Sequence, residues 1–415
     1  MTGADLESTD DGFVRLLLAH LGAAMIATGQ PVNEIEEELV EVGSQLGYPH
    51  AQVGAAPTGI TLSLRSGDPA TYESVTAAIR LDQASEVRRI RHQLVFGELS
   101  AVHAFEQLST VRSKPPLYAA WLTKVAWVLV AVGIALILQP GWANVAAVVI
   151  CSIAVLGLMS VARRFQMLAT LLPTIAAFVV TAFVFLAADA GWVQGPLRTV
   201  LPPIAALLPG ALIVTGMSEL AAGHMQAGAS RLAYGTVQLG LFALGLIAAT
   251  TVLQVPAEMM VNVRVDDIGW AAPVVGLLLI ALGISLMESV PLSMSAWVLL
   301  VLVMAFAAQA GGHAMGSAAL GGFFGAIAAS LGATFVELLR PRLARLVLFL
   351  PAFWLLVPGS LGLIGVTTLV ADRDRIIETG LDIVAVICAI ALGLLVGSAM
   401  GLALRNRLRP APLVS

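Results

Sequence analysis

The sequence contains few charged residues and almost no cysteine. Only 12% of its 415 residues are Asp, Glu, Lys or Arg, whereas 58% are hydrophobic, and the mean hydropathy is +0.91. This composition excludes an ordinary soluble globule and indicates long membrane-spanning segments. The two cysteines, Cys151 and Cys388, lie in apolar stretches and provide neither a disulfide framework nor metal-ligand spacing.

Common motifs of catalysis and cofactor binding are also missing. There is no Walker-type phosphate loop, so we do not expect the chain to hydrolyse ATP. No Gly-x-Ser-x-Gly nucleophile motif occurs, and no cluster of His, Cys and carboxylates has metal-ligand spacing. No basic stripe interleaved with aromatic residues suggests nucleic acid. We therefore expect a protein that is not an enzyme and that uses no cofactor, metal or nucleic acid.

Charge is distributed unevenly along the chain. Residues 1–118 contain eight Lys and Arg against 15 Asp and Glu, whereas the remainder contains 14 against 11. This contrast predicts an acidic, water-soluble N-terminal domain followed by a membrane body. The apolar stretch at 13–27 follows four acidic residues instead of the basic residues of a signal peptide. We interpret it as an amphipathic helix of a cytoplasmic domain.

The N-terminal domain, residues 1–116, is expected to be a small α+β unit that ends at a Pro-Pro pair. Its expected elements are helices at 12–28 and 31–46, strands at about 50–56 and 59–65, and mostly helical structure over 71–111. A proline opens the second helix, where a missing N–H costs nothing. That helix carries a single apolar face formed by Val32, Ile35, Leu39 and Val42.

Ten apolar stretches follow, each long enough to cross a bilayer. They lie at about 119–138, 143–162, 166–188, 201–222, 229–254, 271–288, 292–310, 313–336, 346–369 and 379–404. Shifting the first five by 149 residues reproduces the starts of the last five to within a few residues. The sequence thus predicts a mainly α membrane protein of ten transmembrane helices, built from two five-helix repeats at 117–258 and 259–415. Because five is odd, the repeats must be inverted.

A Pro-Gly pair occurs near the middle of the fourth span and again in the ninth. Pro209-Gly210 in the first repeat corresponds to Pro358-Gly359 in the second. Proline removes a backbone hydrogen bond and glycine leaves helical geometry easily. Freed backbone groups at that depth are tolerated only where they face protein or a wet cavity. We expect all four residues to contribute to substrate binding; a packing kink without a ligand is the alternative.

Glu219 is the acidic residue of interest in the fourth span, and it follows Thr215 and Ser218. It lies nine residues past Gly210, roughly 13 Å along a helix, near the cytoplasmic edge. Ionisable groups within spans are candidates for function. We expect Glu219 to couple transport to protons and the two hydroxyls to bind substrate; the alternative is an interfacial residue that ends the span. Glu288 and Glu337 are interpreted as flanking charge.

The basic residues in the short loops indicate the orientation. With the N-terminus inside, eleven Lys and Arg fall in inner segments and four in outer segments. This bias predicts a multi-pass protein of the cytoplasmic (inner) membrane whose N-terminus and C-terminus are both cytoplasmic.

The chain resembles the threonine/serine exporter family in its fused form, over nearly its whole length. In the N-terminal domain the resemblance is carried by short motifs, and in the body by the ten spans and both Pro-Gly repeats. The motifs are Gly29, Ile35-Glu36-Glu37, Leu46-Gly47, Pro57-Thr58, Leu81-Asp82 and Glu86-Val87. The resemblance implies export of threonine and serine driven by the proton gradient. Some relatives are linked instead to dicarboxylates such as succinate.

We therefore expect a secondary transporter that exports small amino acids. The spans contain almost no deep positive charge, which suits a neutral or zwitterionic solute better than a dianion. Two alternatives stay open: a dicarboxylate exporter of the same fold, and a membrane-anchored sensor or enzyme that works through the N-terminal domain. The expected partners are the small-molecule substrate and the lipid bilayer, and a homo-oligomer is left open.

Overall fold

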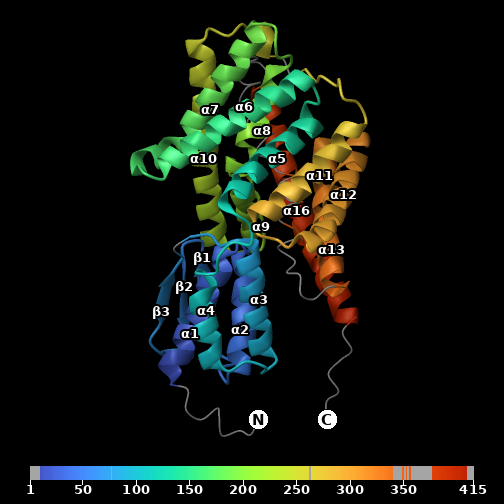
Figure 1. Cartoon of the computed structure of the whole chain (residues 1–415). Helices are drawn as coiled ribbons and strands as arrows, with labels where there is room; N and C mark the ends of the chain where they lie inside the picture. Colours follow the sequence, from blue (N-terminus) through green and yellow to red (C-terminus); the bar gives the residue numbers. More distant parts are fainter. Residues whose placement is uncertain are drawn as a thin grey trace.

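The chain forms an α+β domain at its N-terminus and a helical body that packs against one end of this domain (Figure 1). The computed structural model describes residues 10–75, 77–260, 263–339, 348, 349, 352, 355, 356 and 376–408. Within them the chain is mainly helical, and its one sheet lies in the N-terminal domain.

The N-terminal domain consists of four helices and a three-stranded sheet, and the first two helices contact the strands (Figure 1). Its elements are α1 (Asp11–Ala27), α2 (Val32–Gln45), β1 (Gln52–Ala56), β2 (Gly59–Ser63), β3 (Thr71–Ser74), α3 (Leu81–Val95) and α4 (Ala101–Val111). The strands are antiparallel in the order β1-β2-β3, and the register places Gln52 opposite Ser63 and Thr61 opposite Tyr72. The predicted helices at 12–28 and 31–46 and the first two predicted strands are confirmed.

Apolar residues of α1 form the centre of this domain. Leu17, Leu18 and Leu21 are fully buried, and α1 contacts β2 and β3 as well as the other three helices. The predicted apolar face of α2 is also fully buried, from Val32 to Val42. The core of the domain is therefore the one that the 3.6-residue periodicity predicts.

The prediction of mostly helical structure over 71–111 was wrong at its start. Thr71–Ser74 forms the edge strand β3, which pairs with β2 along its length. Threonine and tyrosine favour strands, and a glycine with positive φ at Gly67 turns the chain back before them. Arg15 of α1 then donates a 2.8 Å hydrogen bond to the Thr71 hydroxyl and ties the strand to the helix below it.

The body is a bundle of helices, and several of them have the length and composition of membrane spans. They are α5 (Ala120–Leu138), α6 (Trp142–Ala162), α7 (Gln166–Asp189), α8 (Pro196–Ile204), η1 (Ala205–Leu207), α9 (Gly210–Ala221), α10 (Met225–Val252), η2 (Ala257–Met260), α11 (Ala271–Met287), α12 (Leu292–Ala314), α13 (Ala318–Leu339) and α16 (Ile376–Leu408). Among the described residues seven helices qualify as candidate spans, or eight if a bent pair counts as one span, and α11 is a shorter apolar helix.

The count of ten spans stays a prediction, because the expected span at 346–369 lies almost entirely outside the described residues. The other nine expected stretches coincide with helices, although their ends differ by up to five residues: α8 begins at Pro196 rather than 201, α13 covers Ala318–Leu339 rather than 313–336, and α16 covers Ile376–Leu408 rather than 379–404. Helix α12 continues to Ala314 rather than ending at 310, and α10 begins at Met225 rather than 229. In both places polar or small residues lower the hydropathy, although the backbone stays helical.

The fourth span is broken at the predicted position. The α8–η1 segment and α9 meet at an angle of 67°. Pro209 lies between them with a non-helical backbone, and Gly210 begins α9. The second Pro-Gly pair, Pro358-Gly359, lies outside the described residues.

The same close helix contact occurs in both halves of the body. A Cβ on Gly245 of α10 would collide with the carbonyl oxygen of Thr174 in α7, and a Cβ on Gly393 of α16 would collide with that of Phe323 in α13. The two carbonyls are 149 residues apart in sequence, and the two glycines are 148 apart. Because glycine has no side chain, the backbones of α7 and α10 can approach each other closely, and so can those of α13 and α16.

Helices α5 and α11 also meet through glycine. A Cβ on Gly133 would lie 2.7 Å from the Gly276 carbonyl oxygen, and a Cβ on Gly276 would lie 2.7 Å from that of Gly133. Further along, a Cβ on Gly283 would lie 2.8 Å from the Ala126 carbonyl oxygen. The pairing order shows that the two helices are antiparallel.

We predict that Gly245→Ala destabilises the body, because its new methyl group meets backbone that cannot move aside. Overpacking of this kind costs about 1–3 kcal/mol, so the thermal unfolding midpoint in detergent should fall. Gly240→Ala is the matched control on the same helix, because a Cβ there meets open space. Equal midpoints for the two variants would contradict the close contact between α7 and α10.

Candidate functional site

A cavity of about 310 Å³ lies between the N-terminal domain and the body. The N-terminal domain contributes the segment that joins α1 to α2, part of α2, and one face of α3. The body contributes α9, α10, α13 and α16. The cavity therefore has walls from helices early and late in the body and from the N-terminal domain.

One face of α9 lines the cavity over most of the helix. Ala211, Thr215 and Ser218 all border it, at the spacing of one helical face. The first of them directly follows Gly210, which is buried at the break, so the cavity extends along α9 from the break toward the N-terminal domain. Of the predicted substrate residues, Thr215 and Ser218 border the cavity, whereas Pro209 lies at the break itself.

Glu219 is completely buried behind this face. Its Oε2 lies 3.1 Å from Nε of Arg231 on α10. Its Oε1 accepts a 3.0 Å hydrogen bond from the backbone N–H of Val32, the first residue of α2. Among the described residues, Glu219 and Arg231 are the only charged ones that are buried. The carboxylate thus joins a membrane helix pair to the soluble domain.

Close packing of α9 and α10 brings this pair together. A Cβ on Gly216 would lie 2.8 Å from the Gly228 carbonyl oxygen, and a Cβ on Gly228 would lie 2.6 Å from the Gly216 carbonyl oxygen. Gly223, with φ of +90°, turns the chain between the helices. The two backbones therefore touch, and Glu219 and Arg231, each three residues after one of these glycines, pair across the contact.

Arg231, one of the eleven basic residues counted above in inner segments, lies within a helix and not in a loop. It lies on α10, which begins before the apolar stretch, and only 8% of it is exposed. The expected span at 229–254 includes Arg231, but hydropathy alone could not show that the side chain is buried against a carboxylate. A signal did exist: a carboxylate within a span needs a partner, and Arg231 is the nearest cation across the hairpin.

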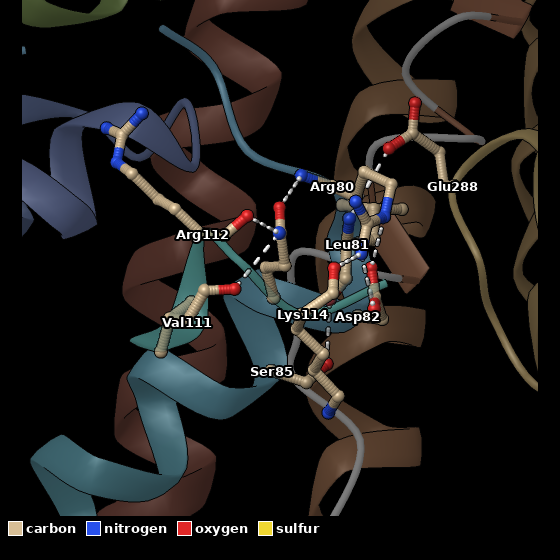
Figure 2. A network of polar contacts seen from close by, with 9 residues as sticks. Arg80, Leu81, Asp82, Ser85, Val111, Arg112, Lys114 and Glu288 are labelled. Carbon is tan, nitrogen blue, oxygen red and sulfur yellow. Dashed lines mark hydrogen bonds and ion pairs between the residues drawn. The ribbon is translucent and has the colours of Figure 1, made fainter. Parts of the chain in front are cut away.

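Two further glutamates of the body contact the N-terminal domain instead of acting only as flanking charge. Glu337, near the end of α13, forms an ion pair with Arg88 of α3. Glu288, which directly follows α11, accepts a 3.3 Å hydrogen bond from the backbone N–H of Leu81, the first residue of α3 (Figure 2). Nothing in the local sequence pattern indicates either contact, because both join residues far apart in the chain.

Positive and negative groups are matched around the cavity. Besides the pairs of Arg231 and Arg88, Arg91 of α3 lies 3.1 Å from a carboxylate oxygen of Glu38 and 3.1 Å from one of Glu41. Burial raises the pKa of Glu38, and the Arg91 guanidinium opposes this shift. In the described part of the chain, no group of three or more His, Cys, Asp or Glu could hold a metal ion.

Residues 16–253 match a family model described as "Putative threonine/serine exporter". The match begins in α1 and ends next to the last residue of α10, so it covers more than half of the chain. The chain belongs to the threonine/serine exporter family. No curated protein and no solved structure matches it significantly.

The exporter family match covers only part of the cavity. The N-terminal domain, α9 and α10 lie within the matched residues, whereas α13 and α16 lie beyond them. The chain is thus a multi-pass membrane protein of an exporter family. In this chain, helices beyond the matched region complete the cavity.

We predict that Arg231→Met destabilises the exporter strongly, because it leaves the buried Glu219 carboxylate without its counter-charge. Removing one partner of a buried ion pair costs about 3–5 kcal/mol. The double variant with Glu219→Gln removes both charges and should recover much of the thermal unfolding midpoint in detergent. Arg164→Met, at an exposed position, is the matched control. A double variant no more stable than Arg231→Met alone would show that the pair does not matter.

Proposed function

We propose that this protein is a secondary transporter that exports threonine and serine from the cell. The observation that carries the proposal is the cavity along α9, which begins at the helix break and has hydroxyl groups and charges of both signs in its walls. Broken helices next to a binding site are typical of secondary transporters. The family match supports the same conclusion.

The chemistry of the cavity favours a small zwitterion. Its volume of about 310 Å³ lies at the lower end of small-molecule sites. Thr215 and Ser218 offer hydroxyls that can bond to the side-chain hydroxyl of threonine or serine. The guanidinium groups of Arg88, Arg91 and Arg231 already face carboxylates. A dicarboxylate would need cationic side chains that are not already paired with a carboxylate of the protein. The pairing of these three arginines therefore favours amino acids over succinate.

We also propose that the two halves form an inverted repeat that rocks about the site. The matched contacts of Gly245 and Gly393 support it, because equivalent helices pack alike in both halves. The α5–α11 crossing supports it as well. If each half takes the place of the other, residue 133 corresponds to 282 and residue 276 corresponds to 127 at the offset of 149. The contact of Gly133 with Gly276 therefore predicts a contact between 127 and 282, and the observed contact of Ala126 with Gly283 differs from it by one residue at each position. This is the relation that a twofold axis in the membrane plane produces.

The orientation and the energy source belong to the same proposal. Both termini lie in the cytoplasm, and the N-terminal domain covers the inner end of the cavity. Glu219 is the proton-coupling residue, since protonation would neutralise the carboxylate that holds Arg231 and the first N–H of α2. A proton taken up there would loosen two contacts at once.

We predict that Thr215→Val and Ser218→Ala weaken threonine export without unfolding the protein. Losing one hydrogen bond of about 0.5–1.5 kcal/mol raises KM about 2–10-fold. Efflux from cells that lack their own exporters and are loaded with a threonine-containing peptide measures this. Ser230→Ala is the control, because its exposed hydroxyl bonds only within α10 to the Gln226 carbonyl oxygen. Export of labelled succinate but not of threonine would establish the dicarboxylate alternative.

We predict that Glu219→Gln removes the dependence of export on the pH gradient. Glutamine can still accept the hydrogen bond from Val32, but it cannot exchange a proton. Because it leaves Arg231 without its counter-charge, the double variant with Arg231→Met is measured beside it. Threonine flux in membrane vesicles with and without a pH gradient measures the effect, and Glu37→Gln, exposed on α2, is the control. Glu219 has no coupling role if flux in its variant follows the gradient as in the wild type.

A further inference from the structure

We propose that the N-terminal domain is the cytoplasmic gate of the exporter. Three carboxylates of the body, Glu219, Glu288 and Glu337, hold the domain against the inner end of the cavity; we name them the docking carboxylates. Solute enters when these contacts break and the domain moves away. The proposal rests on export through the cavity, and it gives the soluble domain a function of its own.

The first docking contact caps α2. The residue before this helix is Pro31, which offers no capping side chain. The first N–H groups of a helix lack partners within it, and its N-terminus attracts negative charge. Glu219, 187 residues away in sequence, accepts from the N–H of Val32 at 3.0 Å. A carboxylate of the body thus supplies the cap that the domain lacks.

The second docking contact lies at the start of α3. Glu288 accepts from the N–H of Leu81 at 3.3 Å, 207 residues away (Figure 2). Arg80, just before this residue, pairs with Asp82 at 2.9 Å and donates a 2.9 Å hydrogen bond to the carbonyl oxygen of Lys114. The same network therefore joins the start of α3 to the segment that leads into α5, the first helix of the body.

The third docking contact pairs Glu337 of α13 with Arg88 of α3. Both residues also line the cavity, together with Ala84 one turn earlier on α3. The pair therefore lies at the wall that separates the cavity from the domain. Breaking it would free one charged group on each side of the cavity.

The hydrophobic cores support a domain that separates as a unit. In the described part of the chain, one apolar cluster lies entirely within the N-terminal domain, and the others lie entirely within the body. No apolar cluster among them spans the boundary, and the docking contacts across it are hydrogen bonds and an ion pair. Domains joined by polar contacts move relative to each other more readily than domains that share an apolar core.

The first experiment measures the separation directly. Ala84→Cys, introduced after replacing Cys151 with Ala and Cys388 with Ser, places a thiol on the cavity wall of α3, where the residue is 4% exposed. A membrane-impermeant maleimide is applied to inside-out vesicles. Glu288→Ala and Glu337→Ala should each raise the labelling rate several-fold. Glu106→Ala, exposed on α4, is the matched control and should leave the rate unchanged.

The second experiment locks the gate. In the same cysteine-free background, Arg88→Cys and Glu337→Cys are bridged by a short bis-methanethiosulfonate cross-linker, which forms one reducible disulfide with each cysteine and releases methanesulfinate. Threonine flux should stop on bridging and return on reduction, and it should fall much further than in either single-cysteine variant treated with the same reagent, which measures the effect of an adduct on the cavity wall. Full flux through the bridged protein would overturn the proposal.

Labelling needs no transport, so the two hypotheses can fail separately. Increased labelling in a protein that moves no amino acid would defeat the proposed export function but keep the docking contacts. Unchanged labelling in an active exporter would show that these carboxylates do not hold the domain, and the gate would be lost.

Discussion

The fully buried carboxylate of Glu219 is the constraint on which the arrangement depends. A buried charge must be balanced, and this one has a guanidinium on one side and a helix N-terminus on the other. The first partner belongs to the adjacent membrane helix and the second to the soluble domain. Neither the α9–α10 hairpin nor the docked position of α2 can therefore change without exposing or unbalancing the charge.

The glycines of the body also fix how its helices are arranged. Gly216 and Gly228 allow α9 and α10 to touch, which brings the buried pair into register. Gly245 and Gly393 allow equivalent contacts in the two halves. A membrane provides little hydrophobic force between helices, so close backbone packing must supply the attraction instead. Glycines at the helix contacts thus fix the positions of the polar residues at the site.

Much of the fold could be predicted from the sequence, because its main determinants are local. Periodicity identified the apolar face of α2, hydropathy located most spans, and the Pro-Gly pair located the break before Gly210. Thr71 to Ser74 was missed, since a four-residue edge strand has too short a pattern. The contacts of Glu288 with Leu81 and of Glu337 with Arg88 could not be predicted, because docking joins residues that no local pattern relates.

The docking contacts are divided between the two halves of the body. Glu219 belongs to the first half, whereas Glu288 and Glu337 belong to the second. A rigid domain bound to both cannot follow two parts that turn in opposite senses, so any rocking of the halves must strain or release at least one attachment. In the proposed transport cycle, the N-terminal domain would therefore resist this rotation, and the strength of its attachment would depend on the angle between the halves.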